Sequence, residues 1–264
     1  MELKEQIFNE KDENQKDLVN PKSLKKHTIL SLSLIWFSYI LIVTFSFGAL
    51  LTWQAPVIKI WISSIFARNP IFAWTLIISL SIVQIVLMLV VGFFAHKLPL
   101  GWLAFFATLY ALMMGVFIIP IIQFFVSQPL SVSFGLILIP SVTMLVMGLL
   151  GYFDVINFKK LWPLILALSI SLIVVSLIAV FTINNSNQRI LTLLISVLGF
   201  IVMALYMGLD FWIISKQGKY ITEYEIQIEK KELNRLGLLF GLHLAIDFIY
   251  MLLYVFRIYQ AVSK

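Results

Sequence analysis

Two aspartates, Asp210 and Asp247, lie inside long apolar stretches of the sequence. An aspartate at the centre of a membrane helix costs about 2.5–3.5 kcal/mol on insertion scales, so such residues usually face a bundle interior or a water-filled path. Their carboxylate oxygens are hard ligands that suit protons and divalent cations such as Ca²⁺. The pair therefore indicates proton or cation chemistry. The alternative is that each aspartate only hydrogen-bonds a neighbouring helix.

The composition identifies the chain as a membrane protein. Of its 264 residues, 61% are apolar and only 12% are charged, whereas soluble domains are about a quarter charged. This excludes a soluble globular enzyme, a nucleic-acid-binding module and a disordered chain. The net charge of +6 is expected to reflect basic loops on one side of a bilayer. The absence of cysteine excludes disulfides and thiol catalysis within the chain.

Seven apolar stretches are long enough to cross a bilayer, since a hydrocarbon core about 30 Å thick needs roughly 20 helical residues. Each must be a helix, because lipid offers the backbone no hydrogen-bond partner. We therefore predict an all-α polytopic protein with a polar cytoplasmic tail (1–27) and a seven-helix domain (28–260). Pro120 and Pro140 should kink the third and fourth helices. The seven stretches are 28–53, 71–95, 99–126, 129–151, 161–182, 190–215 and 236–260.

Basic residues are unevenly distributed between the two sets of loops. Of 19 Lys and Arg residues, 14 lie in the N-terminal tail and in segments 96–98, 152–160 and 216–235. The positive-inside rule then predicts a cytoplasmic N-terminus and, after seven crossings, an external C-terminus. The first apolar stretch is far longer than the apolar region of a signal peptide. We expect it to be retained in a protein of the plasma membrane.

Helix arithmetic places Asp210 and Asp247 at similar depths. If the sixth helix leaves the membrane near Lys216 and the seventh enters near Gly237, the two aspartates lie about 9 and about 15 Å inside. Helix tilt can absorb the difference of about 6 Å. Two carboxyl groups close together in a medium of low dielectric constant do not both ionise cheaply, so we expect them to share one proton. Such a pair could act as a pH sensor.

Three neighbouring side chains could tune this pair. His243 precedes Asp247 by one helical turn on the same face and could relay a proton, although an inert buried histidine is an equally good interpretation. Tyr206 precedes Asp210 by four residues, and Tyr250 follows Asp247 by three. Either hydroxyl could hold a carboxylate in place.

At these residues the sequence resembles the Bax-inhibitor-like family, also called the transmembrane Bax inhibitor motif family. The resemblance implies seven helices, with two three-helix layers around the last one. It also implies a pH-sensitive Ca²⁺ leak channel of the bacterial type, controlled by paired Asp210 and Asp247, which would also contact the Ca²⁺ in transit. The residues that carry the resemblance are Leu244–Arg257 with its Asp-Phe-Ile sequence, Ala204–Asp210, Gly101-Trp102, and Gly115 followed by Pro120.

The chain departs from this family at the end of the second helix. Bacterial relatives carry an arginine there that latches onto the first aspartate, and the corresponding place here falls at or next to Ala95. His96 and Lys97 are therefore the candidate latch, although lysine lacks the bidentate fork of arginine. Some relatives also have an acid in this helix where the present chain has Gln84. In this hypothesis ionised Asp210 holds the latch closed, and acidification releases it.

Other function classes find less support in the sequence. It contains no phosphate-binding loop, metalloprotease motif or nucleophile elbow, so neither an enzyme nor a cofactor is expected. Two alternatives remain: a proton-coupled transporter of a small solute, and a scaffold that binds other membrane proteins without transport. The expected partners are the lipid bilayer, Ca²⁺ as the permeant ion and protons, and not nucleic acid. Arg257, near the outer end of the last helix, is expected to snorkel to the interface.

Overall fold

Helices make up almost all of the computed structural model, which describes residues 18–19, 28–54, 70–94, 97–181, 188–224 and 228–263. Six of the helices in these ranges are long and apolar enough to cross a bilayer, and α4 adds a shorter apolar helix, Ser79–Phe94. The chain is therefore an all-helical, multi-span membrane protein. Its elements are β1 (Leu18–Val19), α2 (Thr28–Trp53), α4 (Pro70–Phe94), α5 (Leu100–Phe117), α6 (Ile119–Ser127), α7 (Leu130–Tyr152), α8 (Phe158–Phe181), α9 (Gln188–Glu223), β2 (Ile228–Glu229) and α10 (Lys230–Val262).

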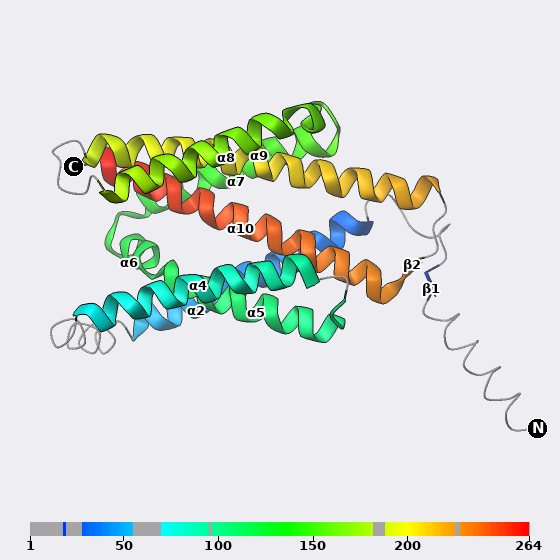
Figure 1. Ribbon diagram of the computed structural model, residues 1–264, viewed down its shortest axis with the longest axis horizontal. Helices are drawn as coiled ribbons and strands as arrows, with labels where there is room; N and C mark the ends of the chain where they lie inside the picture. Colours follow the sequence, from blue (N-terminus) through cyan, green and yellow to red (C-terminus); the bar gives the residue numbers. More distant parts are fainter. Residues whose placement is uncertain are drawn as a thin grey trace, which may run out of the picture.

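The last helix, α10, lies between two layers of helices. One layer consists of α7, α8 and α9, the other of α2, α4 and α5, and α6 links the layers at one end (Figure 1). α10 packs against α2, α5, α7 and α9. In its most apolar window 72% of the residues are buried, against 11–33% in the other five long helices. The contacts of α10 with both layers account for this burial. The predicted arrangement of two three-helix layers around the last helix is confirmed.

Two helices are longer than a bilayer requires. α9 has 36 residues and α10 has 33, or about 54 and about 50 Å at 1.5 Å per residue. Both extend toward the end of the bundle where β1 pairs antiparallel with β2, which we call the strand end (Figure 1). The opposite end, which holds the C-terminus, we call the C-terminal end. The predicted loop 216–235 is thus largely helical, since α9 continues to Glu223 and α10 begins at Lys230.

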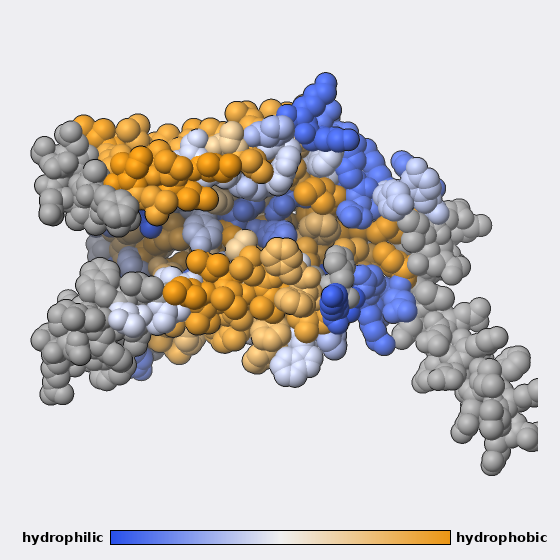
Figure 2. All heavy atoms as spheres, in the orientation of Figure 1, coloured by the Kyte–Doolittle hydropathy of each residue, from blue (hydrophilic) through white to orange (hydrophobic). Residues whose placement is uncertain are grey.

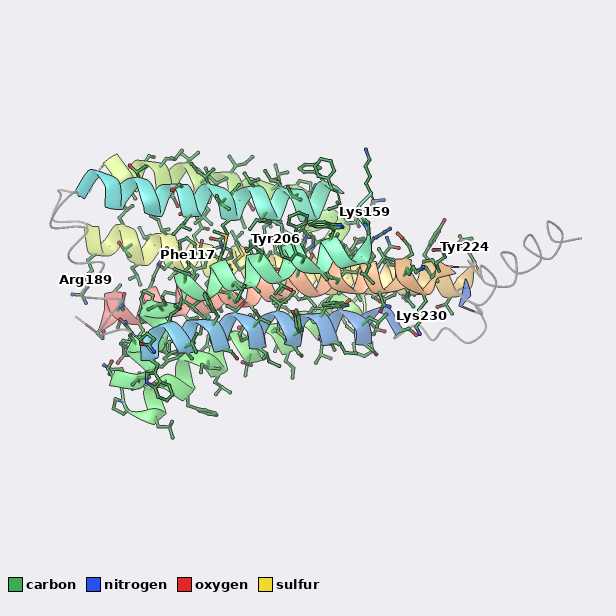
Figure 3. All side chains as sticks on the ribbon, turned by 90° about the horizontal axis from the view of Figure 1, so that it is seen from below. Phe117, Lys159, Arg189, Tyr206, Tyr224 and Lys230 are labelled. Carbon is green, nitrogen blue, oxygen red and sulfur yellow. The ribbon has the colours of Figure 1, made fainter. Side chains whose placement is uncertain are left out.

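The two ends of the bundle differ in polarity. Hydrophilic side chains gather at the strand end, and apolar side chains cover the middle (Figure 2). Lys159 and Lys230 lie at the strand end and Arg189 at the other (Figure 3). Of the segments that were predicted to share one side of the membrane, the described residues 18–19, 97–98, 152–160, 216–224 and 228–235 lie at one end of the bundle (Figure 1). The side of the membrane that this end occupies stays a prediction.

The third predicted helix is broken rather than kinked. α5 ends at Phe117, and α6 begins at Ile119 with Pro120 in its first turn. A proline in the first turn leaves no helical hydrogen bond unmade, because that N–H has no partner within the helix. Pro140, in contrast, lies inside α7, which continues past it to Tyr152.

Helices approach one another most closely at glycines. A Cβ atom added to Gly151 of α7 would overlap the carbonyl oxygen of Gly208 in α9. A Cβ atom added to Gly241 of α10 would lie 2.6 Å from the carbonyl oxygen of Ser33 in α2. Helices in lipid associate through close van der Waals packing, which small residues permit. These glycines therefore set how near α9 and α10 lie to their neighbours.

Asp154 fastens the turn between α7 and α8 to α9. Its φ of 59° lies in the left-handed region, which aspartate and asparagine tolerate better than most residues. Its carboxylate accepts hydrogen bonds from Lys216 Nζ at 2.7 Å and from Trp212 Nε1 at 2.6 Å. The bond from Lys216, followed by the bond from Trp212, lowers the pKa of Asp154 below its ordinary value.

We expect Gly151→Ala to destabilise the protein, because the added methyl group would overlap the backbone of α9. Overpacking of this kind costs about 1–3 kcal/mol. Gly135→Ala in the same helix is the matched control, since no atom lies within 4 Å of a Cβ added there. The unfolding midpoint (Tm) of the purified protein in detergent should fall for Gly151→Ala only. An equal fall in both variants would contradict close packing at Gly151.

We expect Asp154→Asn to lower the Tm modestly at neutral pH, because it keeps the left-handed turn but removes the charge that faces Lys216. Since folding lowers the pKa of Asp154, its stabilising contribution is fully present above the ordinary carboxyl pKa of 3.8. The contribution is lost as the pH falls below that value through the folded-state pKa. The Tm difference between wild type and variant should therefore be constant from about pH 8 to about pH 5 and shrink in stronger acid. A difference that vanishes near pH 6 would refute this assignment.

Candidate functional site

Asp210 and Asp247 occupy neighbouring positions in the bundle. Asp210 lies on α9 and Asp247 on α10, and these two helices pack against one another. Only 9% of the surface of Asp210 and 8% of that of Asp247 are exposed. The charge of Asp210 acts on the carboxyl group of Asp247, so the two acids lie within electrostatic range. Both are therefore enclosed by protein rather than exposed to lipid.

One carboxyl oxygen of this pair lacks a partner. Asp247 Oδ2 is buried and makes no hydrogen bond to any described residue. Buried polar atoms are nearly always hydrogen-bonded, and leaving one unsatisfied costs about 1–3 kcal/mol. A proton shared with a second acceptor, a water molecule or a cation would satisfy this oxygen. The geometry is therefore suited to binding one of these between α9 and α10.

The pair supplies two charged ligands for a cation. Within the described ranges no group of three or more His, Cys, Asp and Glu side chains is placed to hold a metal ion. Ca²⁺ in a dedicated site takes six to eight oxygen ligands. An ion that must leave again needs weaker binding than such a site provides. Two carboxylates thus fit a cation in transit better than a resident one.

The three predicted tuning residues differ in their surroundings. The hydroxyl of Tyr206 shares a hydrogen bond of 3.1 Å with Ser169 Oγ in α8, and Tyr206 lies near the middle of the bundle's length (Figure 3). Tyr250 lines a cavity between α4, α5 and α10. His243 is half-buried on α10. No described hydrogen bond joins Tyr206 to Asp210, and the tuning role of all three residues stays a prediction.

Of the two candidate latch residues, His96 lies outside the described residues. Lys97 is exposed in the turn between α4 and α5, and its backbone N–H donates to the Phe94 carbonyl oxygen at 2.9 Å. The latch role of both residues stays a prediction.

Arg235 of α10 contacts the same turn. Its Nη2 donates to the Leu98 carbonyl oxygen at 2.9 Å, and its Nη1 donates to Glu232 Oε2 at 2.5 Å. The side chain is only 18% exposed. Leu98 lies in the turn between Phe94 and Leu100, so this hydrogen bond ties that turn to α10. Sequence analysis missed Arg235 because it assigned the residue to a loop. Arg235 follows Glu232 by three residues, a spacing that favours an ion pair within a helix. This spacing could have indicated that the segment is helical.

Comparison with known protein families gives a match over nearly the whole chain. The family model described as "Inhibitor of apoptosis-promoting Bax1" matches residues 26–264. This range includes all the described helices and both buried aspartates. A search of curated proteins finds no match.

We expect Arg235→Gln to loosen the turn between α4 and α5, because the bond to Leu98 is lost. Lys97 in this turn is a trypsin site, so limited proteolysis followed by mass spectrometry should detect cleavage after Lys97 several-fold faster. Glu232→Gln is the matched control, since it removes the charge partner of Arg235 but leaves the bond to Leu98 possible. Cleavage at the wild-type rate in Arg235→Gln would show that this contact does not hold the turn.

Proposed function

The chain belongs to the Bax inhibitor-1 family, and from this premise we propose that it is a channel through which Ca²⁺ leaks down its gradient. Protonation of Asp210 and Asp247 is the proposed gate. The observation that carries the proposal is the burial of two interacting acids on adjacent helices, with one oxygen unpartnered. Acidic side chains within membrane helices face one another, other protein groups or a water-filled path, and not lipid.

The gate works through the charge of the pair. Ionised Asp210 attracts a basic group at the strand end of α4, for which His96 and Lys97 are the candidates. Two opposite unit charges about 4 Å apart attract by about 4 kcal/mol at an effective dielectric constant of 20. Losing an interaction of that size shifts an equilibrium between closed and open states by about three orders of magnitude. Acidification neutralises the aspartate, removes the attraction and opens the path.

We also propose an orientation in the membrane, which rests on the distribution of basic residues. Basic residues gather in the tail and in the segments at the strand end, which favours a cytoplasmic position for that end. The C-terminal end then faces outward across the plasma membrane. Ca²⁺ entering from outside would meet the aspartates in the half of the bundle nearer the cytoplasm.

Reconstitution into vesicles loaded with a Ca²⁺ dye tests the proposal. We expect the Ca²⁺ flux of the wild type to rise several-fold between about pH 7.5 and about pH 6. Asp210→Asn and Asp247→Asn mimic the protonated state, so both should lose this pH dependence. Asp154→Asn, which alters an acid outside the pair, is the matched control and should keep the wild-type profile.

Two outcomes would count against this function. If both pair variants keep the wild-type flux and pH profile, the pair is not the gate. If a Ca²⁺ gradient alone drives no flux, while an added solute causes saturable proton uptake, the protein is a proton-coupled transporter.

A further inference from the structure

A cavity of about 270 Å³ lies between α4, α5 and α10. Its lining runs from the middle of the bundle to Arg257, which is five residues from the end of α10 at Val262. Figure 2 shows a recess in front of α10, where hydrophilic side chains lie between the apolar surfaces of α4 and α8. The polar residues of the cavity lining come from all three helices and are Ser81, Gln84, Tyr110, Tyr250 and Arg257.

Arg257 gives this cavity a positive charge. None of the residues that line the cavity is acidic. In the described part of the chain, Arg257 forms no ion pair, and its guanidinium lies 5.9 Å from the centre of the Tyr254 ring. Its charge acts on the neighbouring hydroxyl of Tyr250. Arg257 is exposed near the end of α10, and a guanidinium without an ion-pair partner there can bind an anion that enters the cavity. Its snorkelling to the interface stays a prediction.

The other polar groups of the lining are suited to bind an anion. Tyr110 and Gln84 are 2% and 8% exposed. The amide nitrogen of Gln84 donates one hydrogen to Met114 Sδ, which leaves its second hydrogen for a ligand. Hydroxyl and amide groups can donate hydrogen bonds to an anion, and a guanidinium adds the stronger, charge-assisted kind. A volume of 270 Å³ holds about nine water molecules at about 30 Å³ each. It therefore has room for a halide or a short carboxylate together with part of its hydration shell.

We propose that this cavity binds a small monovalent anion, a halide or a short carboxylate such as acetate. Arg257 supplies the charge, and Gln84, Tyr110 and Tyr250 supply hydrogen bonds. Arg257, the charged group of this site, lies ten residues from Asp247, about 15 Å along α10, whereas the charge of Asp247 acts on Tyr110 at the other end of the site. Arg257 disfavours a divalent cation in this part of the cavity and favours an anion. The proposal does not depend on the proposed channel activity.

Thermal unfolding of the purified protein in a neutral detergent tests the proposal. At constant ionic strength, gluconate, a bulky anion, is replaced stepwise by chloride, bromide or acetate. A ligand that binds the native state alone raises its stability with concentration, so the Tm of the wild type should rise saturably by a few degrees. Arg257→Gln should abolish this rise, and Arg257→Lys should keep part of it. No Ca²⁺ flux is measured, so failure here is distinct from failure of the channel proposal.

Arg189→Gln is the matched control. Arg189 lies at the same end of the bundle (Figure 3) but donates its hydrogen bonds to the carbonyl oxygens of Ala261 and Val262. The variant should have a lower basal Tm and an unchanged response to chloride. Crystals grown with bromide give a second readout, an anomalous peak beside the Arg257 guanidinium. This readout needs no variant to fold.

Two results would overturn the proposal. One is an equal response to chloride in the wild type and in Arg257→Gln, or no response in either, together with the absence of a bromide peak. The other is stabilisation by phosphatidylglycerol added to the detergent with no response to halide or acetate. The second result would mean that Arg257 binds the phosphate of a lipid headgroup rather than a small anion.

Discussion

A carboxyl group at the depth of lipid tails must be enclosed by protein, and this constraint accounts for the position of α10. The helix that carries Asp247 is the one that both layers cover, and Asp210 faces it from the adjacent α9. Glycines such as Gly241 let α2 approach closely enough to complete the enclosure. Burial of the acids, close helix packing and the two-layer architecture are therefore consequences of one requirement. Because the same enclosure leaves Asp247 Oδ2 without a partner, it also creates the site for which a function is proposed.

Hydropathy was sufficient to predict the membrane-spanning helices, because lipid permits little other than a helix over some 20 apolar residues. It was not sufficient where helices continue into water. Beyond Lys216, α9 mixes charged, polar and apolar residues, and a hydropathy average cannot distinguish such a helical segment from a loop. The break at Ile118 was missed for a different reason. A proline shows that one hydrogen bond is absent, but packing around it decides whether a helix bends or a new one begins.

The two candidate sites differ in how far sequence could predict them. Each aspartate in the pair is conspicuous by itself, because a charge in an apolar stretch needs an explanation. The cavity near Arg257 joins residues of three helices, and tyrosine and glutamine are unremarkable in any one of them. Their convergence depends on the rotation of α4, α5 and α10 about their own axes. Close contacts such as those of Gly115 in α5 with Thr44 and of Gly241 in α10 with Ser33, both in α2, help to set those rotations, and they involve residues distant in the sequence.

The short ladder between β1 and β2 constrains the number of membrane crossings and the order of events during biosynthesis. Backbone hydrogen bonds between Leu18–Val19 and Ile228–Glu229 require both segments to lie on the same face of the bilayer. The number of crossings between them must then be even, as it is when α2, α4, α5, α7, α8 and α9 each cross once and α6 does not. The ladder also cannot form until the ribosome has translated all six of these helices. β1 can therefore pair with β2 only after most of the chain has been synthesised.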